Sequence, residues 1–579
     1  MQKLYTDEGL NLPEIPWNRY PRPQMERAEW LCLNGKWSFY SENTRKREIL
    51  VPFCPESLLS GMLNPPEPGT EMIYEREFYI PESWRGSRVL LHFGAVSREC
   101  RVSVNDREVC RHDNAYLPFS ADITEALEDG RNLLRVRVLN DLSTQYPRGK
   151  QTRNRGGMWY TPVSGIWQTV WLEPVPERYI QGISISTGTD CAEVKINGLT
   201  DGYVLFEGER IPIKEGRARI EVSDPKIWSP ECPNLYFFEV RCGEDRIKSY
   251  FALRVLTIQN VNGADRLCLN GKAYFFNGLL DQGYWSDGLY TPAGPEAYEK
   301  DILTMKSLGY NTLRKHIKIE PEQFYYDCDR LGMIVFQDMV NNGDYHYLRD
   351  TVLPTIGVTG ITDARLNRDP QTRTIFLQAL DDTVRLLSNH PSICLWTIFN
   401  EGWGQFCADE AYERLKALDA SRFIDSTSGW FHQKKSDVDS LHIYFKKLRP
   451  GTEAKPQVLS EFGGYTYKIP EHSFNLKKTY GYKKYKERDA FIKGLLTLYQ
   501  EVYQLAKEGL SGAIYTQLSD VEDETNGLFT FDRKVLKVQP QEIKLLMDRI
   551  CHAAEEKTEY WAGKKNVGHC KGNNESRQG

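Results

Sequence analysis

Several sequence features are scarce or missing in this chain. It has no apolar run long enough to span a bilayer, and its start, MQKLYTDEGLNLPEIPW, lacks the charged and apolar segments of a signal peptide. Removal of an earlier signal peptide would leave the same start. No dense Lys/Arg run occurs and the formal net charge is only -5, so no nucleic acid and no membrane is expected as a partner. These features predict a cytoplasmic protein with a neutral ligand.

Motifs of several enzyme classes are missing as well. The 13 cysteines form no C-x-x-C pair, which favours buried reduced thiols over disulfides or a zinc site. The sequence contains no H-E-x-x-H, no G-x-S-x-G elbow and no G-x-G-x-x-G after a strand. This disfavours a metal-dependent or serine hydrolase, and the sequence indicates no metal and no cofactor.

Aromatic residues are abundant, at 12% of the chain. Most are expected as core and cross-strand partners in all-β modules, and a few could line a sugar pocket. At 579 residues the chain exceeds what one hydrophobic core supports, so two to four domains are expected. The sequence leaves open whether the chain forms a homo-oligomer.

The first half of the chain shows the pattern of two β-modules. From Leu31 to about Glu177, short runs of alternating polarity such as RVLLHFGAV at 88–96 predict an antiparallel sandwich. A second all-β block of about 80 residues ends near Arg254, and its size suits an immunoglobulin-like sandwich. We place the two modules at 1–177 and 178–258.

After Gln259 apolar runs alternate with helical stretches, as in βα units around a parallel sheet. Helices are expected at 295–308, 372–388 and 486–508, and the gap between runs five and six is weakly helical. A (β/α)8 TIM barrel is therefore predicted over 259–557, followed by a disordered or loosely attached polar tail at 558–579. The eight runs are 273–280, 311–317, 333–339, 393–401, 423–428, 441–445, 457–463 and 512–520.

The active site of a TIM barrel lies where its strands end. Run four ends in TIFNEGW at Glu401, and run seven ends in VLSEFGG at Glu461. Cleavage of a glycosidic bond requires one carboxyl to protonate the leaving oxygen and a second to act from the opposite face. Two Glu at strand tips supply such a pair, although a single Glu is usually a structural ion-pair partner. Other run ends carry the polar side chains Arg314, His316, Gln337, Asp338, His442, Tyr444, Gln517 and Asp520.

The span from about Leu31 to Lys537 resembles glycoside hydrolase family 2, which includes β-galactosidases, β-glucuronidases and β-mannosidases. LNGKWSF at 33–39, VSVND at 102–106, AYLPFSADIT at 115–124 and SGIWQTVWLE at 164–173 resemble its sugar-binding jelly roll, and IWSPECPNLYFFEV at 227–240 its immunoglobulin-like module. The resemblance implies a multidomain fold of a jelly-roll β-sandwich, an immunoglobulin-like β-sandwich and a C-terminal TIM barrel.

The resemblance also implies roles for single residues. Glu401 matches the acid/base and Glu461 the nucleophile, while Asn400 matches the residue that hydrogen-bonds the sugar 2-hydroxyl. Arg314 and His316 resemble the segment whose Arg contacts the nucleophile, and Tyr444 resembles the tyrosine that hydrogen-bonds it. Trp403 would stack on sugar or aglycone, or pack under a lid.

Departures from the family pattern affect the expected substrate. The Arg and His of the family's R-G-x-N-x-H stretch are missing at 277–282. The segment DQGYWSDGLY at 281–290 is expected to replace them, and its pocket candidates are Asp281, Trp285 and Asp287. His442 and Gln517 are further candidates for the pocket. Thr516 stands where several members have Trp. The Asn-x-Lys motif that β-glucuronidases use for the substrate carboxylate has no counterpart in ETNGLFTFDRK.

These residues predict a retaining, exo-acting β-glycoside hydrolase that cleaves a terminal neutral sugar by double displacement, with β-galactosides ranked first. A retaining pair should have carboxyl groups about 5 to 5.5 Å apart. The alternative is a β-glucuronidase or β-mannosidase of the same family. A carbohydrate-binding protein without catalysis is a second alternative, which the presence of both Glu disfavours.

Overall fold

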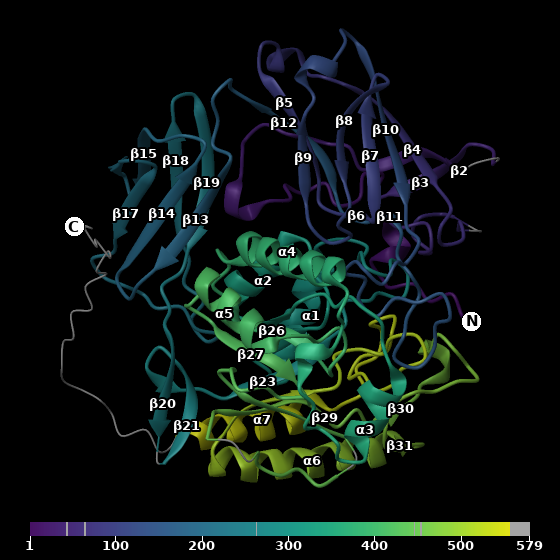
Figure 1. Cartoon of the computed structure of the whole chain (residues 1–579), viewed down its shortest axis with the longest axis vertical. Helices are drawn as coiled ribbons and strands as arrows, with labels where there is room; N and C mark the ends of the chain where they lie inside the picture. The colour runs from purple at the N-terminus through teal and green to yellow at the C-terminus, as the bar shows by residue number, and fades with distance from the viewer. Residues whose placement is uncertain (42–43, 63–64, 262, 445, 452–453, 556–579) are drawn as a thin grey trace.

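The computed structural model describes residues 1–555 except 42–43, 63–64, 262, 445 and 452–453. Three regions follow one another along the chain, two of antiparallel sheets and one built around a parallel sheet (Figure 1). The polar tail predicted at 558–579, and Phe445 at the end of run six, lie outside the described residues.

The N-terminal region is a sandwich of two antiparallel sheets around one core. Buried and exposed side chains alternate along strands such as β2, because successive side chains of a strand point to opposite faces. One sheet has the order β1-β12-β5-β9 (Leu31–Cys32, Val170–Val175, Arg88–Phe93, Phe119–Asp122). The other has the order β3-β2-β4-β10-β7-β8 (Arg47–Val51, Gly35–Ser41, Met72–Tyr79, Arg131–Leu139, Glu99–Val104, Arg107–His112), and β6 (Val96–Ser97) pairs with β11 (Gly165–Ile166).

The second region is a smaller sandwich with its own core. Its sheets are β13-β14-β17 (Gly182–Thr187, Cys191–Asn197, Arg217–Glu221) and β16-β15-β18-β19 (Glu209–Ile213, Gly202–Phe206, Tyr236–Cys242, Asp245–Phe251). Both sandwiches and the barrel agree with the predicted architecture, while the exact domain boundaries stay predictions.

The third region contains an eight-stranded parallel sheet, and each predicted run contributes one strand. Its hydrogen-bonded order is β27-β26-β25-β24-β23-β32-β29-β28, so β27 and β28 are the two ends of the sheet. The strands are Phe423–Ser428, Ile393–Asn400, Ile334–Asp338, Thr312–Lys315, Phe276–Asp281, Leu510–Tyr515, Gln457–Phe462 and Asp439–Ile443 in that order. A small sheet of β20, β21 and β22 (Leu256–Val261, Ala264–Leu269, Lys272–Ala273) precedes it.

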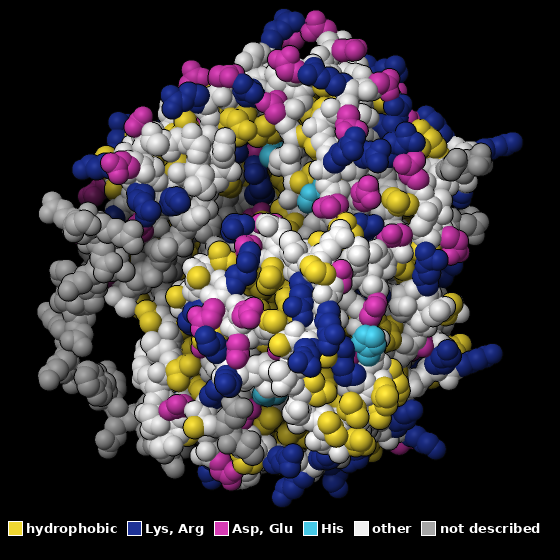
Figure 2. Space-filling view, in the orientation of Figure 1, with side chains coloured by type: hydrophobic (Ala, Val, Ile, Leu, Met, Phe, Trp, Pro, Cys, Tyr) yellow, Lys and Arg dark blue, Asp and Glu magenta, His cyan; other side chains and the backbone are white. Residues whose placement is uncertain are grey.

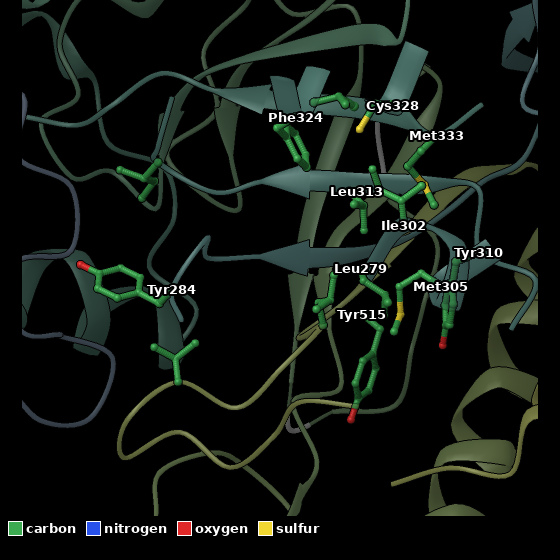
Figure 3. Packing of buried hydrophobic residues seen from close by; sticks show 14 of the residues in the cluster. Leu279, Tyr284, Ile302, Met305, Tyr310, Leu313, Phe324, Cys328, Met333 and Tyr515 are labelled. Carbon is green, nitrogen blue, oxygen red and sulfur yellow. The ribbon is translucent and has the colours of Figure 1, made fainter. Parts of the chain in front are cut away.

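Helices surround this barrel (Figure 1). They are α1 (Glu296–Ser307), α2 (Glu322–Leu331), α3 (Leu353–Thr355), α4 (Pro370–Leu387), α5 (Ala408–Leu418), α6 (Arg488–Glu508) and α7 (Pro540–Glu555). The described residues between β27 and β28 contain no helix, as the weak helical pattern there predicted. Figure 3 shows Leu279 and Leu313 on neighbouring strands packed with Ile302 and Met305 of α1, which is how the helix layer covers the sheet.

Buried charges join the two sandwiches. Arg27, in the N-terminal segment, forms ion pairs with Glu173 of the first sandwich at 3.1 Å and with Asp245 of the second at 2.8 Å. Arg22 adds a 2.6 Å ion pair to Glu173. Burial of such ions is tolerated only when each keeps its partner, so this cluster makes the two sandwiches depend on each other.

Two further predictions can be compared with the described residues. None of their helices combines the length and hydrophobicity that crossing a bilayer needs, and the 12 cysteines among them carry free thiols. Cationic and anionic side chains are interspersed over the visible face (Figure 2).

Candidate active site

The two predicted glutamates lie at neighbouring points of the barrel mouth. Glu401 directly follows β26 and has a left-handed backbone with φ 54°, and its N–H donates to the Ser428 carbonyl at 2.9 Å. Such a conformation costs a non-glycine residue about 1 to 2 kcal/mol. The next residue, Gly402, is also left-handed, and a Cβ there would lie 2.3 Å from the Phe431 ring. The turn therefore fixes where the Glu401 side chain starts.

Glu461 is the fifth residue of β29, and its carboxyl faces that of Glu401. One carboxylate oxygen of each Glu and a ring nitrogen of His442 all lie within 4.8 Å of one another. Retaining glycosidases hold their two carboxyls about 5 to 5.5 Å apart, whereas inverting ones need about 6.5 to 9.5 Å to admit a water. The spacing is that of a retaining pair.

Glu461 is held as an anion. Burial by itself raises its pKa, but the charges of His442 and Arg314, followed by His316 and Lys150, more than offset this and lower it to about 2. The Arg314 Nη1 lies 3.2 Å from Oε1 of Glu461, and the Tyr444 hydroxyl donates to its Oε2. A carboxylate kept ionised in this way is suited to act as a nucleophile.

Arg314 organises the floor of the site from β24. Its guanidinium is fully buried and donates to Asp338 at 2.9 Å and to the Asn400 Oδ1 at 2.8 Å. Because Oδ1 accepts this bond, the Asn400 amide nitrogen points away from Arg314 and is available as a donor. Asp338 also accepts from His316 Nδ1 at 2.7 Å, and burial lowers the pKa of His316.

His442, on β28, connects Glu401 to a buried row of serines. Its Nδ1 lies 2.8 Å from Oε1 of Glu401, and its Nε2 lies 3.0 Å from the Ser428 Oγ. Ser428 in turn donates to the Ser460 Oγ at 2.9 Å. The Ser428 oxygen can therefore accept the Nε2 hydrogen, and Nδ1 is the ring nitrogen that contacts Glu401.

Aromatic rings enclose the carboxyl pair. Tyr444 stacks on Tyr482 with ring centroids 4.0 Å apart, and Trp430 meets His442 edge-on at 5.5 Å. Trp403, just beyond Glu401, is only 3% exposed and packs against Trp159 of the N-terminal region at 5.2 Å. Trp403 thus fills a packing role, whereas Trp430 and Tyr482 lie beside the site residues His442 and Tyr444.

Two models of known protein families match this chain. The model of the glycosyl hydrolases family 2 TIM barrel domain matches residues 260–537, and that of the family 2 sugar binding domain matches residues 60–176. The chain belongs to glycoside hydrolase family 2. It is a glycoside hydrolase, as the two glutamates and the resemblance predicted.

Relatives within family 2 carry more than one specificity. The chain is 27% identical to a β-galactosidase of Lactococcus lactis, covering 71% of this chain but only 44% of that protein. It is 24% identical to a β-glucuronidase of Felis catus, covering 94% of both chains. Among solved structures, a β-D-glucuronidase of Dictyoglomus thermophilum superposes with a TM-score of 0.72 at 18% identity over 92% of this chain and 98% of that one. A β-galacturonidase of Eisenbergiella tayi superposes with a TM-score of 0.67 at 20% identity, over 93% of this chain and 99% of that one.

Three predicted pocket residues of the 281–290 segment have their contacts elsewhere. Asp281 forms a 2.6 Å ion pair with the Lys315 Nζ, and Asp287 accepts from the N–H and hydroxyl of Thr6 at 2.8 and 2.7 Å. Trp285 is buried, and the Arg533 guanidinium lies 4.3 Å from its ring centroid. These contacts give their pocket role no support.

The eighth strand is shorter than expected. β32 ends at Tyr515, so Gln517 and Asp520 lie in the following loop. The Gln517 amide donates to Glu524 at 3.0 Å and to Asn526 at 2.8 Å. Gln517 thus belongs to a polar cluster beside the site, together with a carboxylate that the sequence did not single out.

Residues from outside the barrel also reach the site. Lys150 of the N-terminal region lowers the pKa of Glu461 and of His316 through its charge, and the Tyr160 hydroxyl donates to Glu524 at 2.8 Å. No spacing rule predicts a contact between modules, and the only local hint for either residue is its closeness to the SGIWQTVWLE motif.

One group of side chains could hold a metal. Among the described residues, only Glu401, His442 and Glu461 form a set of three or more His, Cys, Asp or Glu whose ligand atoms lie within 4.8 Å of one another. An ion there would occupy both carboxyls needed for glycoside cleavage, so we assign this set to acid–base and nucleophilic chemistry.

Proposed function

We propose that this family 2 enzyme is a retaining, exo-acting β-glycoside hydrolase that removes a terminal neutral sugar, with β-galactosides first among its substrates. The observation that carries the proposal is the close approach of Glu401 and Glu461, with one carboxylate oxygen of each within 4.8 Å of the other, because an inverting pair needs about 6.5 to 9.5 Å to admit a water.

In the first step the ionised Glu461 attacks the anomeric carbon while Glu401 gives its proton to the leaving oxygen, and the glycosidic C–O bond breaks. His442 Nδ1 contacts the Glu401 carboxyl at 2.8 Å and orients it. The Asn400 amide, oriented by Arg314, is positioned to donate to the sugar 2-hydroxyl.

In the second step water displaces Glu461 from the anomeric carbon and gives up a proton to Glu401. Two inversions leave the product in the β configuration. Glu401, which gave up its proton in the first step, acts as the general base for this water, and the proton that it takes up restores it for the next cycle.

The substrate is tested with a panel of nitrophenyl β-glycosides that contains galactoside, glucuronide, mannoside, xyloside and arabinoside. We expect the wild type to favour a neutral sugar, and Glu461→Gln to be inactive on every member. Glu413→Gln is the control, because Glu413 is exposed and its pair with Lys435 is a surface ion pair of little energetic weight. The β-glucuronidase alternative follows from the full-length similarity to the Felis catus enzyme, and glucuronide turnover above every neutral sugar would establish it instead.

Azide distinguishes the acid/base role of Glu401 from the nucleophile role of Glu461. Glu401→Ala should still be glycosylated by substrates with activated leaving groups, and azide should raise its turnover and give a β-configured glycosyl azide. Glu461→Gly should react only by direct azide attack and give an α-configured product. Products of the opposite configurations would exchange the two assignments.

A further inference from the structure

A loop of the N-terminal region crosses the barrel mouth and is tied down on both sides. On one side Gly343 N–H donates to the Thr144 carbonyl at 2.6 Å, and the Asn342 amide donates to the Gln145 carbonyl at 2.8 Å. On the other side Thr161 N–H donates to Glu522 at 2.9 Å. The loop of residues 144–161 is therefore part of the wall of the site.

The middle of this loop places Lys150 next to the end of β24. Gly149 packs so closely on the barrel that a Cβ there would lie 3.1 Å from the Ile317 carbonyl, one residue after His316. The following Gln151 amide donates to the Tyr116 and Tyr290 hydroxyls at 3.0 and 3.3 Å. The backbone on both sides of Lys150 is thus fixed.

The Lys150 ammonium has no partner among the residues that the structure describes. Among the described residues, no carboxylate lies within ion-pair distance of its Nζ and no atom accepts a hydrogen bond from it. Its charge nevertheless acts on Glu461, His316 and Glu524. A half-buried cation whose charge acts on three groups of the site, and which bonds to none of the described residues, is available to a ligand.

Glu524 is the second charged group of this wall. It is 4% exposed and accepts hydrogen bonds from Tyr160 at 2.8 Å, Gln517 at 3.0 Å and Asn526 at 3.1 Å. A carboxylate has about four acceptor positions, so one remains. Burial raises the pKa of Glu524, and Lys150 is the foremost charge that opposes this.

We propose that Lys150 and Glu524 bind hydroxyl groups of the terminal sugar, at the end away from the scissile bond, and exclude uronic acids from the site. This inference rests on the proposed function and names the feature that sets its specificity. A hydroxyl can accept from the ammonium and donate to the carboxylate at once. A uronate carboxylate would instead meet two anions, Glu461 and Glu524, and the single cation Lys150, and like charges in a confined site are unfavourable.

The test compares wild type, Lys150→Met and Glu524→Gln on the best neutral substrate of the panel, on its monodeoxy analogues and on the glucuronide. A hydrogen bond to a charged group contributes about 1.5 to 3 kcal/mol, so Lys150→Met should lower kcat/KM for the neutral substrate by about 10- to 100-fold. Deoxygenation at the contacted position should cost the wild type about tenfold or more and the variant less than about twofold. Lys36→Met is the control, because Lys36 is exposed and pairs only with exposed Glu48.

Glu524→Gln should raise the ratio of glucuronide to neutral-sugar kcat/KM by about tenfold or more, because it removes one of the two anions. Lys150→Arg, which keeps the charge, should retain more activity than Lys150→Met, and matching thermal melts of all variants show that each is folded.

Three results would overturn the inference while leaving the proposed function intact. They are equal deoxygenation costs in wild type and Lys150→Met, an unchanged substrate ratio in Glu524→Gln, and a Lys150→Met variant that loses glucuronide turnover alone. The last would make Lys150 an anchor for a uronate. A folded wild type that cleaves no glycoside of the panel would refute the proposed function and this inference with it.

Discussion

The hydrogen bond from Tyr444 to Glu461 offers a direct test of how the nucleophile is kept ionised. Tyr444→Phe removes one donor from the Glu461 Oε2 and preserves the ring that stacks on Tyr482 at 4.0 Å. A hydrogen bond to a charged acceptor contributes about 1.5 to 3 kcal/mol. Because a tenfold change in a protonation equilibrium corresponds to about 1.4 kcal/mol, the pKa of Glu461 should rise from about 2 to about 3 to 4.

The sign of the effect on activity follows from the mechanism. Glu461 must be ionised to attack, so kcat/KM falls as the pH drops through its pKa, and the wild type should keep its activity toward acid until close to pH 2 or until it unfolds. In Tyr444→Phe this acid limb should move up by about one to two pH units. On the plateau we expect a decrease of about tenfold, since the carboxylate loses one of the bonds that orient it.

The assay is the pH dependence of kcat/KM on an aryl glycoside between pH 3 and 8, with melts at each pH to exclude unfolding. Tyr79→Phe, at an exposed position of the first sandwich, is the matched control. Superimposable acid limbs for wild type and Tyr444→Phe would refute the view that this hydroxyl stabilises the anion.

Three other substitutions test parts of the structure. Asp338→Asn leaves the buried Arg314 without one charged partner. The free energy of unfolding should fall by about 3 to 5 kcal/mol, which lowers both the melting temperature and kcat/KM, and an unchanged melting temperature would contradict this. Trp403→Ala should lower the free energy of unfolding by about 3 to 5 kcal/mol and change KM by less than about twofold, because the Trp403 ring is almost wholly buried. A large change in KM without a loss of stability would show instead that the ring stacks on substrate. Asp287→Ala frees the Thr6 N–H at a cost of about 1 to 3 kcal/mol and should speed limited proteolysis of the first residues, and equal cleavage rates would argue against that role.

The barrel was predictable because its strands are buried on both faces. All six residues of β23 and all five of β25 are buried, so they appear in the sequence as short apolar runs, and a side chain at the end of such a run must face the mouth. This is why Glu401, Glu461 and Tyr444 could be proposed from their positions alone.

The parts of the site that could not be predicted come from loops and from another module. Asp287 follows a strand end closely, yet it bonds Thr6, 281 residues earlier in the chain, and no local pattern contains that information. Lys150 and Tyr160 belong to a loop whose path depends on bonds to barrel loops at 341–343 and 522–524. Such contacts are fixed by tertiary packing, which periodicity does not record.

Arg27 has a consequence for anyone who wishes to shorten or recombine this enzyme. Its guanidinium is shared between Glu173 and Asp245, so a cut between the two sandwiches would leave the buried Asp245 without its cation. Grafting the catalytic barrel onto foreign β-modules would break different bonds, since Thr6 of the same N-terminal segment donates two hydrogen bonds to Asp287 of the barrel. The unit of exchange in this chain is the complete set of modules.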